Sequence, residues 1–188
     1  MIRRSCIFLT IVVVVGILMP GGQAAATDAT PFTARQGLDL ATDAARVWAA
    51  DAKLTYLEND ETVSGAGTSL RWGYLFYSKA KGEARGYTVR GGKILEAKDL
   101  EFDFDAPPIT SDWIDSAEAL LLAEKRAGKS YRRDHGGRLD SMLLIRGAFD
   151  EKNPDASTWA LVYTSDEDPT LFVVIDAVKG KVVKIWRG

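Results

Sequence analysis

Cysteine and histidine are almost missing from this chain of 188 residues, which contains one of each. The cysteine, Cys6, lies in an apolar N-terminal segment, so residues 27–188 contain no disulfide and no thiol. Zinc sites are built mainly from cysteine and histidine side chains. With His135 as the single histidine, we expect no metal site and no cofactor. A chain exported without disulfides must be stable through its hydrophobic core alone.

The chain also lacks a strong excess of either charge. It has 24 basic and 26 acidic residues, a net charge of −2, which becomes −4 when Arg3 and Arg4 are removed. Proteins that bind nucleic acid depend on a surplus of lysine and arginine to neutralise phosphates. The composition therefore indicates a soluble domain and no nucleic-acid partner.

The N-terminus has the features of an export signal. Arg3 and Arg4 precede an apolar run, residues 7–19, and three alanines at positions 24–26 supply a small-residue cleavage site. The apolar run is shorter than the roughly 20 residues that a membrane-spanning helix needs. The sequence predicts a signal peptide over 1–26 and a periplasmic or secreted protein that leaves the membrane after cleavage. An uncleaved anchor is the alternative.

Two stretches, residues 71–78 and 158–165, have the pattern of the same strand occurring twice. In each one a tryptophan is followed by alternating large residues and then by a serine. Side chains two residues apart share one face of a strand. Each stretch is followed by a second strand pattern and a Gly-Lys turn, at Gly92-Lys93 and Gly180-Lys181. The spacing from tryptophan to glycine is similar in both, which indicates a duplication.

The remaining patterns predict a helix before each set of strands. Helices are expected over 33–52 and from Ser111 or Asp112 to Gly128, and further strands over 53–58, 87–90, 94–97, 140–146, 171–176 and 181–186. We therefore predict an α+β fold made of two helix-plus-antiparallel-sheet repeats with pseudo-twofold symmetry. The repeats are predicted over 33–99 and 111–188, with a linker over 100–110. Two such units would bury their apolar faces together or form one continuous sheet.

The second half of the chain resembles the PepSY domain of bacterial secreted and envelope proteins. The likeness rests on Trp159 and Tyr163, and on the run that contains Asp176, Ala177 and Gly180. In the first half Trp72 and Gly92 match, whereas Arg90-Gly91 replaces the Asp-Ala pair. The resemblance implies a non-catalytic module that binds or inhibits peptidases, or that senses ligands in the envelope.

The aromatic residues of the two tryptophan strands have two interpretations. They can form a core beneath the helices, or they can line an apolar groove that accepts a peptide or a lipid. On the second interpretation the candidate binding residues are Trp72, Tyr74, Trp159 and Tyr163.

Other motifs do not support a catalytic site. His135 lies in a basic segment, residues 131–138, with no G-x-S-x-G nucleophile motif in the chain. Residues 127–130 end like a phosphate-binding loop, but they end a predicted helix rather than begin one. The carboxylates at 101, 103 and 105 offer oxygen ligands for calcium, but they lack the glycine and terminal glutamate of an EF-hand loop.

These observations lead to one functional prediction and one alternative. We predict a non-enzymatic exported module that binds another envelope or secreted protein, with a peptidase as the partner class that the resemblance implies. The alternative is a carrier that holds a small apolar ligand between helices and sheet, which requires a roomy enclosed cavity.

Overall fold

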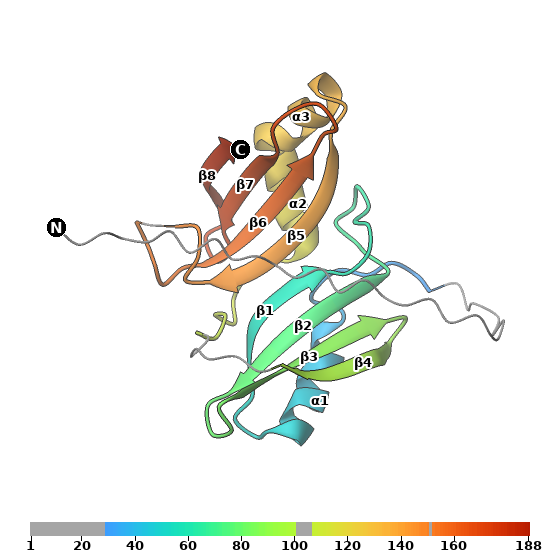
Figure 1. Cartoon of the computed structure of the whole chain (residues 1–188), viewed down its shortest axis with the longest axis vertical. Helices are drawn as coiled ribbons and strands as arrows, with labels where there is room; N and C mark the ends of the chain where they lie inside the picture. The colour runs from blue at the N-terminus through green and yellow to red at the C-terminus, as the bar shows by residue number, and fades with distance from the viewer. Residues whose placement is uncertain (1–28, 101–106, 151) are drawn as a thin grey trace.

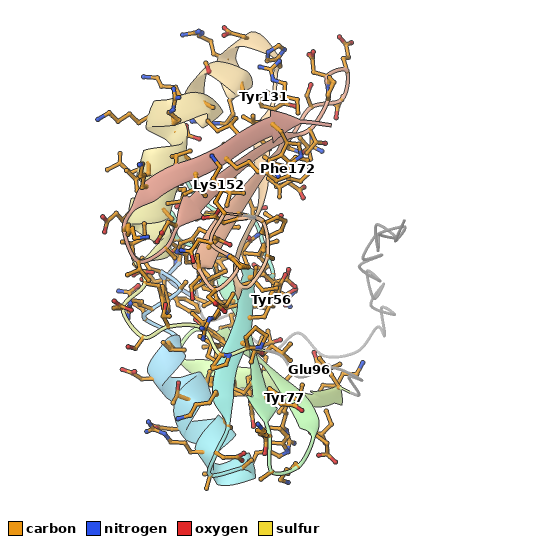
Figure 2. All side chains as sticks on the ribbon, turned by 90° about the vertical axis from the view of Figure 1, so that its left-hand side faces the viewer. Tyr56, Tyr77, Glu96, Tyr131, Lys152 and Phe172 are labelled. Atoms are coloured by element: carbon orange, nitrogen blue, oxygen red, sulfur yellow. The ribbon has the colours of Figure 1, made fainter. Side chains whose placement is uncertain are left out.

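The computed structural model describes residues 29–100, 107–150 and 152–188. The predicted signal peptide, residues 1–26, lies outside this range, and so do residues 101–106, which form most of the predicted linker and contain the three candidate calcium carboxylates. The described residues form one antiparallel sheet with the helices on one side of it (Figure 1). The other side of the sheet carries no helix of the described chain (Figure 2).

The elements alternate from a helix to strands twice along the chain. In order they are α1 (Leu38–Trp48), β1 (Lys53–Asn59), β2 (Arg71–Ser78), β3 (Glu83–Arg90), β4 (Lys93–Leu100), α2 (Ser116–Ala123), the π-helix η1 (Glu124–Gly128), α3 (Lys129–Asp134), β5 (Arg138–Arg146), β6 (Ser157–Thr164), β7 (Leu171–Asp176) and β8 (Lys181–Arg187).

The prediction of two helix-plus-sheet repeats with pseudo-twofold symmetry is wrong. The eight strands form one sheet in the order β4-β3-β2-β1-β5-β6-β7-β8. The helical parts also differ, because α1 is one helix of 11 residues whereas α2 has 8 residues and continues through η1 into α3. The fold is α+β only in the broad sense. The predicted boundaries at 33–99 and 111–188 are not tested by these findings and stay predictions.

The centre of the sheet is the junction of β1 and β5. Tyr56 pairs with Ile145, and Glu58 pairs with Leu143, in an antiparallel ladder. Beyond the end of this ladder the Ile109 N–H donates to the Leu54 carbonyl at 2.8 Å. The first strands of the two predicted repeats thus satisfy each other's backbone groups, which is why one sheet replaces two.

The helices begin and end elsewhere than the sequence pattern predicts. The first predicted helix, 33–52, is reduced to α1, which begins after Gly37. The second begins after Asp115, whose carboxylate accepts a hydrogen bond from the Ser116 N–H, rather than after Ser111 or Asp112. It also continues past Gly128, its predicted end, so that part of the basic segment 131–138 is helical in α3.

One hydrophobic core fills the space between the helices and the sheet. Trp72 from β2 and Trp159 from β6 meet edge to face, with ring centroids 6.5 Å apart, and Trp113 packs on Trp159 at 5.9 Å. All three side chains are buried. Because Trp72 and Trp159 come from opposite sides of the β1–β5 junction, the core is shared by the whole sheet.

The loop before β2 and the segment before α1 are both bonded to the beginning of α2. The Ser116 hydroxyl donates to the Gly67 carbonyl at 2.7 Å and accepts from the Ala34 N–H at 3.0 Å. The Arg35 N–H donates to the Asp115 carboxylate at 3.1 Å. These bonds join residues far apart in the sequence, so the start of α2 is held against the segment before α1 and the loop before β2.

Candidate functional site

The four predicted binding residues lie in the core and not on a surface. Trp72, Tyr74, Trp159 and Tyr163 are each at most 1% exposed. Both indole N–H groups donate to backbone carbonyls at 2.8 Å, and the Tyr74 hydroxyl donates to the Ala34 carbonyl at 2.7 Å. Burial raises the pKa of Tyr74 and Tyr163. These positions agree with the interpretation in which the aromatic residues form a core beneath the helices. None of the four side chains is available to a ligand in this conformation.

The surface that remains accessible is the side of the sheet opposite the helices. Residues paired across neighbouring strands share a face, so the strand pairing identifies its members. We call this surface the open face and define it by its partly exposed apolar and aromatic side chains: Tyr56, Leu75, Tyr77, Leu143, Ile145, Val162, Phe172 and Trp186. Tyr56, Tyr77 and Phe172 lie along this side in Figure 2.

A hydrogen-bonded pair occupies the middle of the open face. The Tyr56 hydroxyl donates to the Glu58 carboxylate at 2.5 Å, from two positions on the same side of β1. Burial raises the pKa of the Glu58 carboxyl, and the hydrogen bond from Tyr56 opposes that rise. Gly73 lies opposite Glu58 on β2, so the carboxylate has no side chain beside it on that strand. The pair is a polar point within a mainly apolar surface.

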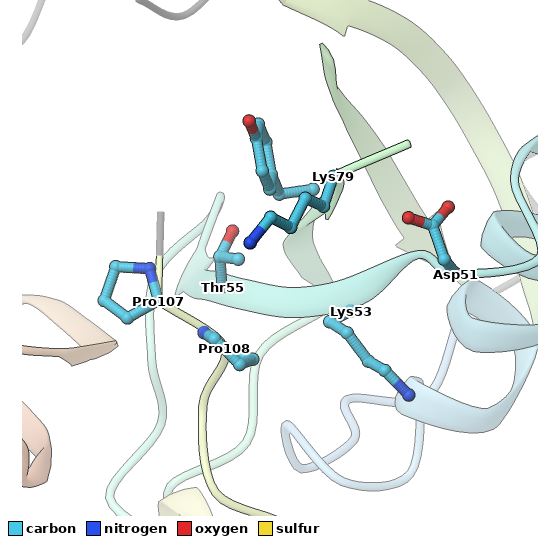
Figure 3. Close-up of a pocket in the computed structure, with 7 residues that line it drawn as sticks. Asp51, Lys53, Thr55, Lys79, Pro107 and Pro108 are labelled. Carbon is cyan, nitrogen blue, oxygen red and sulfur yellow. The ribbon is translucent and has the colours of Figure 1, made fainter. Parts of the chain in front are cut away.

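A cavity of about 360 Å³ opens where β1 begins and β2 ends. It is lined by Asp51, Lys53, Thr55, Tyr77, Lys79, Pro107 and Pro108. Figure 3 shows the Lys79 ammonium directed toward Thr55, whereas the Lys53 side chain extends in a different direction. Because the two ammonium groups do not converge, the cavity is not organised around a single anion.

Asp51, which follows α1, is hydrogen-bonded to the end of β2 beside this cavity. Its carboxylate accepts hydrogen bonds from the Ser78 hydroxyl at 2.6 Å and from the Ala80 N–H at 2.8 Å. The bond from Ser78, followed by the one from Ala80, holds the pKa of the Asp51 carboxyl below its ordinary value of 3.8.

We expect this carboxylate to make the stability of the protein depend on pH in acid. A carboxyl whose pKa is lower in the folded state stabilises the fold above its unfolded pKa, and that contribution is lost as the pH falls through the folded value. Asp51→Asn should therefore flatten the loss of stability below pH 3.8. Denaturant unfolding across the acid range tests this, with Asp39→Asn, an exposed position on α1, as the control. Equal acid sensitivity in the Asp51 variant and the parent would contradict it.

Aromatic rings gather at the other end of the open face. Phe172 and Trp186 stack with centroids 4.6 Å apart and planes 4° from parallel, and Phe149 lies 6.4 Å from Trp186. Phe149 has a φ of 64°, and the Asp150 N–H donates to the Ala148 carbonyl at 2.8 Å, so the chain makes a three-residue γ-turn there. A bulky residue with positive φ is strained, and Phe149 is 36% exposed.

The single histidine contacts an acid but is not arranged for nucleophilic catalysis. His135 Nδ1 lies 3.1 Å from the Asp168 carboxylate, and the Ser165 hydroxyl donates to the His135 backbone carbonyl rather than to the imidazole. A serine nucleophile needs its hydroxyl bonded to the base. The three residues therefore connect the end of α3 to the turn between β6 and β7.

The basic residues near His135 are paired. Arg132 bonds to Glu124, and Arg133 bonds to Asp134 at 2.6 Å. Arg138 lies 3.2 Å from Asp166. Each arginine therefore already has a carboxylate partner, which leaves little free charge for an anionic ligand.

Two negative findings hold for the part of the chain that the structure describes. Among those residues, no cluster of three or more histidine, cysteine, aspartate and glutamate side chains could hold a metal ion. Within the same ranges, every helix is too short or too polar to cross a membrane.

The open face was not identified from the sequence pattern. Its members occupy the alternate positions of the same strands whose other face forms the core, for example Leu75 between Tyr74 and Phe76. Period-two alternation separates the two faces, but it does not say which one the helices cover. One feature of the sequence could have indicated the open face: β2 and β6 carry large residues on both of their faces.

The comparisons with known proteins show the fold but no family. No protein-family model matches the chain, and no curated protein matches it. The fold is similar to the crystal structure of a candidate lipoprotein from Clostridium difficile 630, with a TM-score of 0.58 and 14% sequence identity over 81% of this chain and 93% of the other. The PepSY resemblance is not tested by these findings and stays a prediction.

Proposed function

We propose that this chain is a non-enzymatic exported module that binds another protein through the open face. The observation that supports the proposal is a sheet whose helices, among the described residues, all lie on one side, and whose other side carries partly exposed aromatic and branched apolar side chains. Surfaces of this kind, with apolar residues between polar ones, are typical of protein interaction sites. A peptidase is the partner class implied by the PepSY resemblance.

The composition of the open face suits a protein partner. Interface centres are enriched in tyrosine, tryptophan and phenylalanine. Tyr56, Tyr77, Phe172 and Trp186 all lie on this surface, and rings with few rotatable bonds lose little conformational entropy on binding. The hydrogen-bonded Tyr56 and Glu58 pair supplies a polar contact near the middle.

The alternative of an apolar carrier has less support. A carrier needs an enclosed apolar cavity between the helices and the sheet. That space holds the side chains of Trp72, Trp159, Trp113 and Tyr163, all buried and in ring contact with neighbours. The cavity beside Asp51 lies at the surface of the sheet and is lined by lysine, aspartate and proline.

Export is supported by two independent features. The first is the predicted signal peptide over 1–26. The second is the similarity in fold to a candidate lipoprotein.

Mass spectrometry of the protein recovered from the periplasm or the medium should find a chain that begins at Thr27, and full-length protein in the membrane fraction would indicate an uncleaved anchor.

Substitutions on the open face should remove partner binding without unfolding the protein. Leu75 and Ile145 flank Tyr56 on the two neighbouring strands and are partly exposed. We expect Leu75→Arg or Ile145→Arg to raise the Kd for a captured partner by about tenfold or more, since one buried unpaired charge at an interface costs at least about 1.4 kcal/mol.

The control for this experiment is Val47→Arg. Val47 is 90% exposed on α1, which lies on the other side of the sheet. Photo-crosslinking from Leu75 and from Val47 identifies the partner, and isothermal titration gives the Kd. If Val47→Arg weakens binding as much as Leu75→Arg does, the open face is not the binding surface.

A further inference from the structure

Glu58 is an acid that lies among apolar side chains in the middle of the open face. It pairs with Leu143 on β5, and Tyr56 lies two positions away on the same side of β1. All three side chains are only partly exposed. A carboxylate enclosed by apolar surface is costly unless a charge of opposite sign or several hydrogen-bond donors compensate it.

The compensation that Glu58 receives is incomplete. The Tyr56 hydroxyl donates one hydrogen bond to its carboxylate, which has about four sites that can accept one. In the part of the chain that the structure describes, no lysine or arginine forms an ion pair with Glu58. Burial raises the pKa of its carboxyl, and the like charge of Asp60 raises it further. The surroundings of Glu58 therefore favour a cation that comes from another molecule.

The arginines at this end of β2 and β3 already hold other acids. Arg71 on β2 lies 2.7 Å from the Asp60 carboxylate and 3.8 Å from that of Glu61. Arg90, its partner on β3, lies 3.4 Å from the Glu61 carboxylate. Moving either guanidinium to Glu58 would take it from the acid that it holds, so these arginines do not supply the missing charge.

The strand beside Glu58 leaves room for a side chain from outside. Gly73 is the partner of Glu58 on β2, and a Cβ placed there would meet only the Glu58 carbonyl oxygen, at 3.9 Å. The next residue in this cross-strand row is Thr88 on β3, which is small, and Glu96 on β4 follows it. A partner's side chain can therefore reach the Glu58 carboxylate over Gly73 without displacing a side chain of the sheet.

Arginine fits these features better than lysine does. Its guanidinium is planar, always charged and more weakly hydrated than an ammonium, so its transfer out of water costs less. Two of its N–H groups can bond one carboxylate side by side. A guanidinium also binds favourably over an aromatic ring, and the ring of Tyr56 lies beside the Glu58 carboxylate.

We propose that the protein partner of the open face places an arginine side chain over Gly73, where its guanidinium pairs with the Glu58 carboxylate. This inference rests on the proposed function, since it uses the same surface and names the contact that selects the partner. A partner with an apolar side chain at this point would bury the carboxylate uncompensated, and a partner with an acid would add repulsion. Glu58 therefore selects a basic surface against neutral and acidic ones.

The test uses the full exported chain and two peptides of matched shape. The first is Ac-Tyr-Leu-Arg-Leu-Tyr-NH2, and in the second citrulline, which has nearly the same shape and no charge, replaces the arginine. NMR titration should show shifts at Tyr56, Glu58 and Gly73. The Kd of the arginine peptide should be at least about tenfold lower than that of the citrulline peptide, because only the first forms the ion pair. A third peptide with glutamate at this position should bind more weakly than both.

Glu58→Gln tests whether the preference for arginine comes from this carboxylate. The amide keeps the shape of the side chain and still accepts a hydrogen bond from Tyr56, and the NMR spectrum checks that the variant is folded. We expect it to bind the arginine and citrulline peptides equally, which completes a double-mutant cycle. Glu96→Gln is the matched control, because Glu96 is exposed in the same cross-strand row. It should keep the tenfold preference, which separates the ion pair from the net charge of the protein.

Two outcomes would overturn this proposal and leave the proposed function standing. In the first, both peptides shift Leu75 and Leu143 but bind the parent equally, so that the open face binds protein segments without selecting arginine. In the second, the preference for arginine persists in Glu58→Gln, so that another acid supplies it. A third outcome, in which no peptide shifts any residue of the open face, would contradict both the proposed function and the pairing at Glu58.

Discussion

Replacing Trp159 with alanine is expected to lower the free energy of unfolding by about 4 kcal/mol, the largest effect we foresee for a single substitution. Trp159 is fully buried, packs edge to face on Trp72 and Trp113, and donates its indole N–H to the Ile114 carbonyl at 2.8 Å. Alanine would leave a cavity among aromatic rings and an unsatisfied buried carbonyl. Chemical denaturation followed by circular dichroism measures the change.

The matched control is Trp186→Ala. Trp186 lies on the edge strand β8, is partly exposed, and stacks on Phe172. Because this side chain is removed from a surface that water can reach, we expect the free energy of unfolding to fall by about 1 kcal/mol. If the two substitutions had equal effects, Trp159 would not be the centre of the core, and the groove interpretation of the tryptophan strands would regain support.

Gly67→Ala is expected to lower the free energy of unfolding by about 3 kcal/mol or more, for two reasons whose effects add. Gly67 has a φ of +74°, which strains any residue with a Cβ. A Cβ there would also lie 2.5 Å from Ala117 Cα and 2.8 Å from the Ser116 carbonyl oxygen, both backbone atoms of α2. The loop would have to leave the helix and lose its bond from the Ser116 hydroxyl.

The same loop supplies the control. Gly65 has no positive φ, and no atom lies within 4 Å of the position that a Cβ would occupy there. Gly65→Ala should therefore change the free energy of unfolding by no more than about 0.5 kcal/mol. Thermal unfolding of both variants measures the difference. If Gly67→Ala were as stable as Gly65→Ala, the contact between this loop and α2 would not contribute to the stability of the fold.

Some parts of the fold follow from local patterns that the sequence displays. The strand from Leu171 to Asp176 agrees with its prediction residue for residue, and the tryptophan strands differ from theirs by one residue at most at each end. Alternation of side chains is a local property, so it needs no knowledge of the partner strand. The strand predicted over 87–90 shows the limit, because β3 already begins at Glu83, where charged residues alternate with small ones.

The helical boundaries depended on contacts that the sequence pattern does not contain. Asp115 begins α2 because the N-terminal segment and the loop at Gly67 are bonded to the residues beside it. The continuation through η1 brings Gly128 against Tyr163, where a side chain would not fit. Both positions are determined by residues at least 30 positions away in the chain.

The sequence by itself determined the presence and order of the strands, the two glycine turns with positive φ at Gly92 and Gly180, and the identity of the large apolar residues. These depend on backbone preferences and on hydrophobic periodicity, which act over a few residues. Only the tertiary structure decided that β1 pairs with β5, and hence that there is one sheet with an open face and an outer edge at β8. Pairing of strands far apart in the chain depends on the packing of the whole core, so no local pattern specifies it.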